Sequence, residues 1–126
     1  PTCIVKITDM DGNVIVEPDR DEHQVYEASA AREMTNILEG VLTRGTARGH
    51  GLSDMPAAGK TGTTNDNIDG WFVGYSAYYT TGVWVGFDSP RGVSALSGAS
   101  YPVDIWHDFM EQIHTGLPEK ALNDQR

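Results

Sequence analysis

The sequence predicts an α+β fold, in which an antiparallel β-sheet carries packed helices. Short runs rich in β-branched and aromatic residues alternate with turn residues, and two longer segments repeat apolar residues at helical spacing. The resulting element order is β-β-α-β-β-β-α. Of the 126 residues, 39% are hydrophobic and 21% charged, which suits a soluble chain that buries one core. We expect one unit over residues 1–118 and a flexible tail over 119–126.

The first two strands are predicted to form an N-terminal hairpin. Residues 3–8, CIVKIT, form an alternating β-branched run, and residues 14–17, VIVE, return as the partner strand. Between them, Asp11 and Gly12 tolerate the positive φ angles of a tight two-residue turn. Cys3, the single cysteine, is expected to pack as a small apolar residue and excludes an internal disulfide.

The first helix is predicted over residues 29–45. Ser29 can cap its start, Arg44 lies in its last turn, and Gly45 can end it. The apolar residues expected to face the sheet recur at spacings of three and four: Ala31, Met34, Leu38, Val41 and Leu42.

A three-stranded antiparallel meander is predicted next, over Ala57–Thr63, Trp71–Tyr75 and Thr80–Phe87. The last two runs are short, apolar and rich in aromatic residues, and the segment DSPRG then ends the sheet. Because these residues alternate along strands, packing between sheet and helix is the expected role of Trp71, Tyr75, Trp84 and Phe87.

The last helix is predicted from Pro102, which suits a first helical turn, to Gly116 and Pro118, which end it. Its apolar stripe comprises Val103, Trp106, Phe109, Met110 and Ile113. We therefore expect this helix to cover one face of the sheet.

Four histidines are candidate metal ligands. His107, Glu111 and His114 lie at spacings of four and three on the last helix and could bind zinc. Their order differs from the HExxH pattern and acidic residues surround them, so a solvated helix face is the favoured interpretation. His23 and His50 fall in polar loops and are expected at the surface. No metal or cofactor is therefore predicted.

The charge balance limits the classes of partner. Lysine and arginine number 9 against 18 acidic residues, giving a net charge of −9 that repels polyanions. Nucleic acid is therefore not expected as a partner. No run of about 18 apolar residues is present, so no membrane-spanning segment is predicted within the chain. Because Pro1 leads directly into a strand pattern, we expect a piece of a longer protein.

The segment PAAGKTGTTNDN resembles two kinds of binding loop, but its residues do not fit either of them. A Walker A loop needs a glycine where Asp54 stands, and a helix after the lysine rather than strands. A calcium loop over NDNIDG would begin at Asn65 and place Ser76 where a bidentate glutamate is needed. A turn stabilised by asparagine and aspartate side chains explains this part better.

The same segment also fits the edge strand of an active site. Lys60 supplies a point charge that can hold a carboxylate, and Thr61 and Thr63 supply small hydroxyl donors. Gly59 and Gly62 would let another backbone approach closely. The free amides of an edge strand can bind an extended peptide or stabilise an oxyanion.

These residues carry a resemblance to a known family. Lys60-Thr61-Gly62 matches the third motif of serine β-lactamases and penicillin-binding proteins. The longer run GKTGTTNDNIDGWFVGYSAYYTTGVWVGFD resembles high-molecular-mass penicillin-binding proteins of class A more closely than β-lactamases. The similarity continues in Gly45-Thr46-Ala47, Gly98-Ala99-Ser100, Ile105-Trp106 and Phe109. It covers nearly the whole chain and corresponds to the C-terminal part of the transpeptidase domain, hence to a partial penicillin-binding protein or serine β-lactamase-like fold.

The resemblance implies a chemistry and roles for four residues. Family members cross-link peptidoglycan through a serine acyl-enzyme formed on the D-Ala-D-Ala stem peptide, and β-lactams trap that serine. By resemblance, Lys60 belongs to the network around the serine of the second motif. Thr61 and Thr63 bind the terminal carboxylate of the donor, Gly62 allows its close passage, and the Thr63 amide forms half of the oxyanion hole.

The first two motifs of the family are absent. None of the seven serines begins a Ser-x-x-Lys or a Ser-x-Asn motif: Ser29, Ser53, Ser76, Ser89, Ser94, Ser97 and Ser100. The nucleophile is therefore expected upstream, and the chain alone is predicted neither to bind penicillin covalently nor to cross-link peptides.

The resemblance also sets expectations for the parent protein. It would be anchored in the bacterial cytoplasmic membrane with this domain on the extracytoplasmic side, and it could carry a glycosyltransferase domain. The expected partners are the stem peptide, β-lactams and the upstream part of the same domain. Without that part, an uncovered apolar face is expected to cause self-association. The alternative function is a non-catalytic module that binds peptide along an exposed sheet edge.

Overall fold

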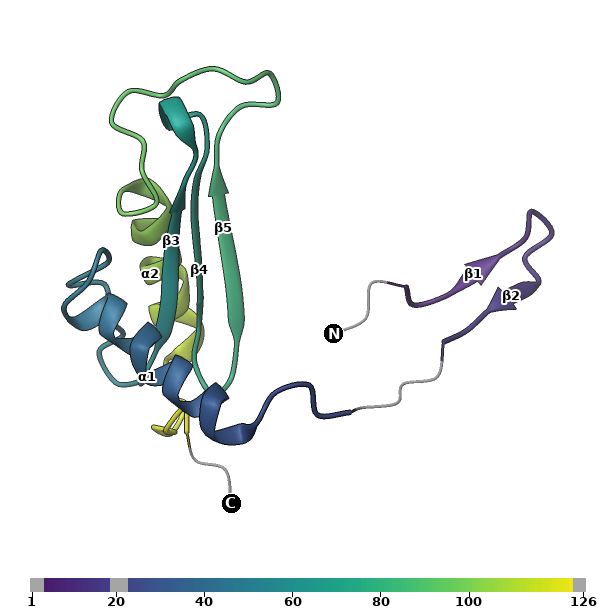
Figure 1. The fold of residues 1–126 in the computed structure, drawn as a ribbon, viewed down its shortest axis with the longest axis horizontal. Coiled ribbons are helices and arrows are strands. Elements are labelled where there is room, and N and C mark those ends of the chain that lie inside the picture. Colours follow the sequence, from purple (N-terminus) through teal and green to yellow (C-terminus); the bar gives the residue numbers. More distant parts are fainter. Residues whose placement is uncertain (1–3, 19–22, 124–126) are drawn as a thin grey trace.

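The computed structural model describes residues 4–18 and 23–123 and confirms the α+β prediction (Figure 1). Two antiparallel sheets and two α-helices are present in these ranges. The elements are β1 (Ile7–Thr8), β2 (Val14–Val16), α1 (Ala28–Thr43), β3 (Ala58–Thr63), the 3₁₀ turn η1 (Asn65–Asn67), β4 (Gly70–Tyr75), β5 (Thr80–Val85) and α2 (Tyr101–His114). The predicted strand at residues 3–8 is longer than β1, and the expectation for Cys3 lies outside the described residues.

The strands β3, β4 and β5 form the predicted meander, in that spatial order. Thr61 faces Phe72, which in turn faces Val83, and the pairing is antiparallel throughout. Because successive side chains point to opposite faces, Gly59, Thr61 and Thr63 share one face of β3, whereas Lys60 and Gly62 lie on the other. The two faces of the sheet have different surroundings.

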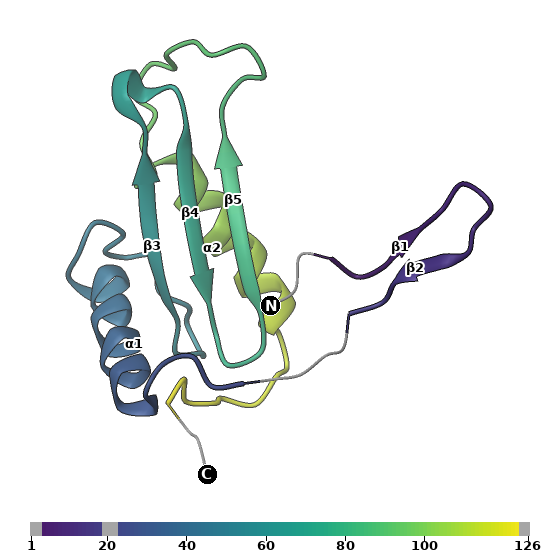
Figure 2. The same ribbon diagram turned by 45° about the vertical axis from the view of Figure 1, so that its right-hand side comes forward.

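Helix α2 covers one face of the sheet and forms the core with it (Figures 1 and 2). The Phe72 ring meets the Trp106 ring edge to face, with centroids 4.9 Å apart, and both side chains are fully buried. Val103 and Met110 of the predicted stripe are also fully buried. Phe109 is 48% exposed, so its predicted place in the core is wrong. The buried stripe is narrower than the apolar pattern of the sequence.

Helix α1 lies beside β3 (Figure 2). Leu42 joins the core, and the Thr35 and Tyr75 hydroxyl oxygens are 3.2 Å apart. Met34 is 54% exposed, so its predicted burial is wrong. The predicted cap is also wrong, because Glu27 occupies the N-cap without a side-chain hydrogen bond and Ser29 lies within the first turn. The helix presents only its C-terminal half to the core.

The second face of the sheet carries exposed aromatic side chains. Trp71 and Trp84 face each other across β4 and β5, and they are 45% and 43% exposed. Val73 beside them and Phe87 beyond β5 are exposed as well. The prediction that the tryptophans of the strands and Phe87 pack against a helix is therefore wrong. This face is apolar, and none of the described helices is packed over Trp71 and Trp84.

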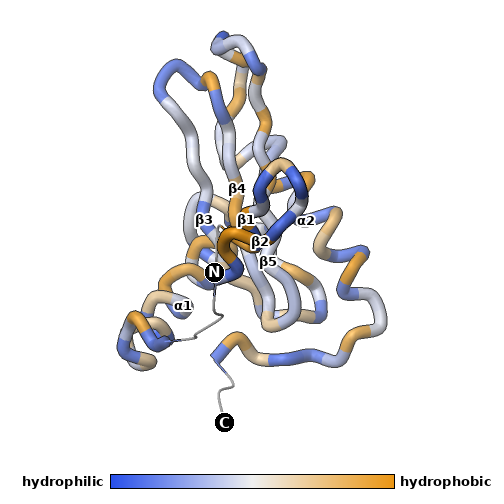
Figure 3. Tube along the Cα trace, turned by 90° about the vertical axis from the view of Figure 1, so that its right-hand side faces the viewer, coloured by the Kyte–Doolittle hydropathy of each residue, from blue (hydrophilic) through white to orange (hydrophobic). Residues whose placement is uncertain are grey.

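The hairpin of β1 and β2 turns at the predicted place, but the predicted two-residue geometry is wrong: Asp11 does not adopt a positive φ, and the Gly12 amide donates to the Asp9 carbonyl. Gly12 adopts φ 87°, a conformation that glycine reaches without steric cost, and the Asp9 amide donates to the Asn13 carbonyl. The hairpin lies apart from the larger sheet in Figure 1, and its strands are among the apolar segments of Figure 3. Its apolar side chains are exposed: Val5, Ile7, Val14, Ile15 and Val16.

The Asp9 carboxylate organises this turn and should make it sensitive to acid. It accepts hydrogen bonds from the Asn13 side chain and from the Asn13 and Asp11 amides, which hold the pKa of Asp9 below its ordinary value. Its contribution to turn stability is therefore present above about pH 4 and lost as the pH falls through its lowered pKa. We expect Asn13→Ala to raise the pKa of Asp9 in an NMR titration, whereas an unchanged pKa would contradict this role.

Candidate functional site

Strand β3 places the predicted site residues on an edge of the sheet. Among the described residues, β3 pairs only with β4, so its second side has no neighbouring strand. Lys60 and Thr63 are exposed, and Thr61 and Gly62 are partly exposed. The lysine and the two hydroxyl groups are therefore accessible at one edge.

Lys60 and Thr61 meet although their side chains leave β3 on opposite faces. The Lys60 ammonium donates to the Thr61 carbonyl over 2.9 Å and to the Thr61 hydroxyl over 3.2 Å. No carboxylate of the described residues lies within ion-pair distance of Lys60. The ammonium therefore remains available for an anionic ligand.

A residue outside the strand holds the Thr61 hydroxyl. Thr46, in the turn that follows α1, has its hydroxyl oxygen 2.9 Å from that of Thr61. The turn is fixed by backbone bonds from Ala47 to Val41 and from Gly49 to Leu42. Thr46 thus gives the Thr61 hydroxyl a defined partner beside the lysine.

Thr63 has a different partner. Its hydroxyl oxygen accepts a hydrogen bond of 3.0 Å from the Gly98 amide, which belongs to the loop between β5 and α2. The structure therefore joins Lys60, Thr61 and Thr46 in one group and attaches Thr63 to a separate segment.

The two glycines of the strand serve different purposes. A Cβ atom on Gly59 would lie 2.6 Å from the Phe72 ring and 2.9 Å from the Val73 carbonyl oxygen, so Gly59 makes room for the core. The approach expected at Gly59 is therefore made by the backbone of β4 and by the Phe72 ring. A Cβ on Gly62 would lie 3.2 Å from that of Trp71, a tight contact on the exposed face.

The segment after β3 forms a turn, as expected. Its aspartates do not belong to any group of three or more described residues that could hold a metal ion. Asp66 and Asn67 adopt φ values of 60° and 53°, which aspartate and asparagine tolerate. The Thr64 amide donates to the Asp69 carbonyl, the Asp69 amide donates to the Thr64 hydroxyl, and the Trp84 indole donates to the Asp69 carboxylate. Asp69 thus closes the turn between β3 and β4 and ties it to β5.

Two of the three candidate zinc ligands of α2, Glu111 and His114, are held by hydrogen bonds to other residues. His114 is buried rather than solvated, and its Nδ1 lies 2.7 Å from the Met110 carbonyl oxygen. Its Nε2 lies 2.7 Å from the Ser76 hydroxyl, whereas Glu111 accepts from the Ser53 amide. Within the described ranges, no group of three or more histidine, cysteine or acidic residues could hold a metal ion.

His50 and His107 form a separate contact. His50 Nε2 lies 2.8 Å from the Asp104 carboxylate, and the two imidazole rings meet at right angles. His50 is partly exposed, so it lies at the surface as expected, but it also contacts α2. This contact ties the loop before β3 to the first turn of α2.

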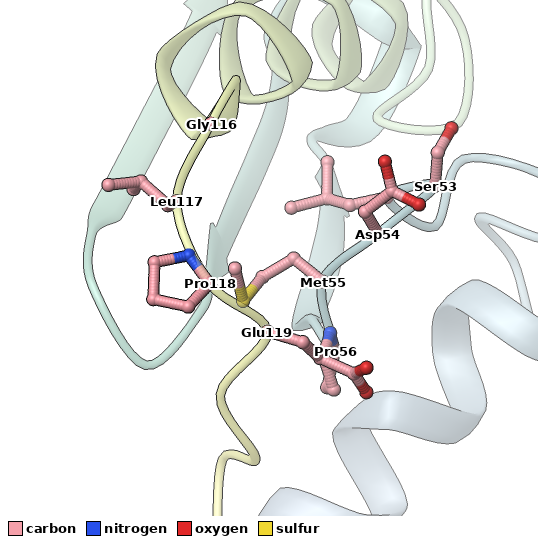
Figure 4. Close-up of a pocket in the computed structure, with 9 residues that line it drawn as sticks. Ser53, Asp54, Met55, Pro56, Gly116, Leu117, Pro118 and Glu119 are labelled. Carbon is pink, nitrogen blue, oxygen red and sulfur yellow. The ribbon is translucent and has the colours of Figure 1, made fainter.

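A hollow of about 720 Å³ lies between the segment before β3 and the segment after α2. Figure 4 shows Met55 and Pro56 on one wall and Leu117 and Pro118 on the other. None of the predicted site residues lines it. The candidate site is therefore the exposed edge of β3 rather than this hollow.

Sequence reasoning missed the roles of Thr46, Asp69 and Gly98. Each acts through a hydrogen bond to a residue remote in sequence, and the pair Thr46 and Thr61 is separated by 15 positions. The resemblance to a known family includes the segments that contain all three residues, and it was the only signal in the sequence that pointed to them.

In the described part of the chain, no helix has the length and apolar character needed to cross a membrane.

Comparison with known proteins identifies related sequences. A family model described as the penicillin binding protein transpeptidase domain matches residues 1–100. Penicillin-binding protein 1A of Aquifex aeolicus is 38% identical over 121 residues, which cover 95% of this chain and 17% of the relative. Penicillin-binding protein 1A of Pseudomonas aeruginosa is 44% identical over 89 residues, covering 69% of this chain and 11% of the relative. Penicillin-binding protein 1B of Haemophilus influenzae is 36% identical over 123 residues, covering 96% and 15%. The chain thus spans less than a fifth of the length of these relatives.

Proposed function

The chain belongs to the transpeptidase-domain family of class A penicillin-binding proteins, and from that premise we propose that it forms one wall of a peptidoglycan transpeptidase site. The observation that carries the proposal is the edge of β3, where Lys60 and Thr63 are exposed, Thr61 is partly exposed, and Lys60 has no carboxylate partner among the described residues. Such an edge offers one cation, two hydroxyls and the backbone amides of a strand to an anionic peptide end.

In the proposed reaction, a serine from the upstream part of the domain attacks the carbonyl carbon of the penultimate D-alanine. The serine loses its proton, the peptide bond breaks, and the terminal D-alanine leaves as a protonated amine. An amine of a second stem peptide then attacks the serine ester, forms the cross-link and returns the proton to the serine. A β-lactam enters the same first step and leaves the serine acylated.

Each residue of β3 has a proposed part in this sequence. The Lys60 ammonium stabilises the hydrogen-bond network around the serine of the second motif and the negative charge that arises near it. Thr61 and Thr63 donate to the terminal carboxylate of the donor, and Gly62 leaves space for its backbone. The Thr63 amide stabilises the developing oxyanion, an interaction that contributes about 10²–10³-fold in other acyl-transfer enzymes.

We propose that the site is divided between this chain, which supplies β3, and the upstream part of the domain, which supplies the serine motifs. This division predicts a clear result with a fluorescent penicillin. The chain by itself should remain unlabelled, because it lacks the Ser-x-x-Lys and Ser-x-Asn motifs. A longer protein that joins this chain to the upstream part of its domain should be labelled. Both are incubated with the probe and resolved on a denaturing gel. A covalently labelled band of the 126-residue chain would contradict the division, and an unlabelled long protein would contradict the function.

The exposed face of the sheet supports a partner from the same domain. Trp71, Val73 and Trp84 form an apolar surface on the side from which Lys60 projects. We expect helices from the upstream part of the domain to cover this surface. We further propose that the parent is anchored in the bacterial cytoplasmic membrane with this domain on the extracytoplasmic side.

Without that cover, the isolated chain is expected to self-associate through the same surface. Trp84→Lys should weaken the association, because it places a charge in the apolar contact, whereas Tyr101→Lys changes an exposed aromatic residue on α2 and should leave it intact. Light scattering over a concentration series measures both. A monomeric wild-type chain at high concentration would argue against the exposed face as the cause.

A non-catalytic peptide-binding module remains the second candidate, and the free edge of β3 favours it. Such a module would bind an extended peptide without an upstream serine. Isothermal titration of the chain with a peptide ending in D-Ala-D-Ala, and with the same peptide ending in an amide, separates the two. Tight binding of both peptides by the chain alone would favour the module.

A further inference from the structure

The loop that leads into α2 packs directly on the backbone of the candidate site. Gly98 is buried, and a Cβ atom at this position would overlap the Trp71 carbonyl oxygen. It would also lie 2.6 Å from the carbonyl oxygen and 2.7 Å from the nitrogen of Gly62. Because these are backbone atoms of two paired strands, they cannot move aside for a side chain. Only glycine fits this place without displacing the loop from β3.

The Gly98 amide uses this close approach to bind the Thr63 side chain. It donates to the Thr63 hydroxyl oxygen over 3.0 Å, a hydrogen bond that fixes the orientation of an otherwise exposed side chain. Since the oxygen accepts this bond, the hydroxyl proton remains free to be donated elsewhere. Thr63 is thus set as a donor toward a group outside the strand.

The turn that carries Gly98 is itself held by Ser100. The Ser97 amide donates to the Ser100 hydroxyl over 3.0 Å, and that hydroxyl donates to the Ser97 carbonyl over 2.7 Å. The Ser100 carbonyl accepts from the Val103 and Asp104 amides of α2. Val103 lies fully buried in the core, so a continuous chain of contacts joins the core to Thr63.

We propose that Gly98 is a positioning residue, which holds the Thr63 hydroxyl ready to donate to the carboxylate at the end of the acyl donor. This inference deepens the proposed function and depends on it for the identity of the ligand. The contact between Gly98 and Thr63 itself is independent of that function. Ser100 supports the same arrangement by fixing the turn.

The first experiment measures the contact in the 126-residue chain by amide hydrogen exchange. Thr63→Val removes the acceptor with little change in shape and should speed exchange of the Gly98 amide about tenfold or more, whereas Thr63→Ser should preserve its protection. Unchanged exchange of the Gly98 amide in Thr63→Val would overturn the proposed contact, whatever the enzymatic function. Ser100→Ala should speed exchange at Gly98 as well.

The second experiment measures acylation in the full transpeptidase that contains this segment. Gly98→Ala should slow acylation by a penicillin about tenfold or more, and it should slow acylation by the corresponding methyl ester much less, because the ester lacks the charged acceptor. Gly51→Ala is the matched control, since a Cβ there has no atom within 4 Å. If Gly98→Ala does not fold, Ser100→Ala replaces it, with the same selective loss expected.

The ratio between acid and ester distinguishes positioning from a general loss of structure. Equal losses for both donors, or no loss for the acid, would overturn the assignment. A wild-type protein that is not acylated at all would instead refute the proposed function, and the exchange measurement would still decide the contact.

Discussion

Replacing Trp106 with alanine is expected to cost about 3–5 kcal/mol of the free energy of unfolding, a large share of the roughly 5–15 kcal/mol that stabilises a typical domain. The Trp106 side chain is fully buried and packs edge to face on Phe72. It lies in the interface between α2 and the sheet of β3, β4 and β5. Its removal leaves a large cavity that the rigid strands β4 and β5 cannot fill. Urea denaturation followed by circular dichroism measures the loss.

Two further variants test the packing itself. Phe109→Ala changes an aromatic residue of the same helix that is 48% exposed, and it should cost under about 1 kcal/mol. Trp106→Phe should cost far less than Trp106→Ala, because it keeps a ring beside Phe72 and removes an indole N–H that has no hydrogen-bond partner among the described residues. Similar losses for Trp106→Ala and Phe109→Ala would show that α2 does not pack as described.

The fit of Trp106 also predicts an energetic coupling with Gly74. A Cβ on Gly74 would lie 2.6 Å from two atoms of the indole ring, so Gly74→Ala should destabilise the chain by about 1–3 kcal/mol. In the background of Trp106→Phe the smaller ring should relieve part of this loss. A double-mutant cycle would therefore give a coupling energy clearly different from zero.

The elements of the fold could be predicted because their signals are local. Asp11-Gly12 marks the hairpin turn, and the spacing of Val103, Trp106 and Met110 marks the buried side of α2. The width of each stripe could not be predicted in the same way. Met34 and Phe109 continue the apolar spacing, yet both are exposed. Periodicity shows which side of a helix faces the core, but it does not show how much of that side other elements cover.

The sheet could not be assigned a covered face from the sequence. In GWFVGY both alternating sets are apolar: Phe72 points to α2, whereas Trp71 and Val73 point away from it. A strand with two apolar faces is typical of a sheet covered on both sides. The wrong prediction for Trp71 and Trp84 therefore has a physical reason, since half of the expected cover is absent from the described residues.

The candidate site, like the fold, could be predicted only where its residues are adjacent in sequence. The prediction of Lys60, Thr61, Gly62 and Thr63 rested on a contiguous motif, and the structure shows that motif on one exposed edge. Gly98 is separated from Thr63 by 35 positions, and no sequence spacing relates them. Contacts of this kind depend on the path of the whole chain, so only the fold reveals them.

Lys60→Ala is expected to slow penicillin acylation of the full transpeptidase by about 10²–10³-fold, the usual range for loss of a group that stabilises developing charge in acyl transfer. Lys60 supplies the only ammonium group on β3, and its hydrogen bonds reach no farther than Thr61. Nothing else on this strand can replace the positive charge beside the serine network. Stopped-flow acylation with a chromogenic β-lactam measures the rate.

The same substitution should leave the fold almost unchanged, and this separates chemistry from stability. Since the Lys60 side chain is exposed and its described hydrogen bonds go only to Thr61, Lys60→Ala should shift the unfolding free energy of the chain by no more than about 0.5 kcal/mol. Lys60→Arg keeps the charge but widens the head group, so we expect only partial recovery of the rate. Lys120→Ala, which removes an exposed lysine above the Tyr78 ring, is the control and should retain full acylation. If Lys60→Ala acylates at the wild-type rate, the wall formed by β3 does not act on the serine, and binding of the peptide end by Thr61 and Thr63 would be its only remaining role.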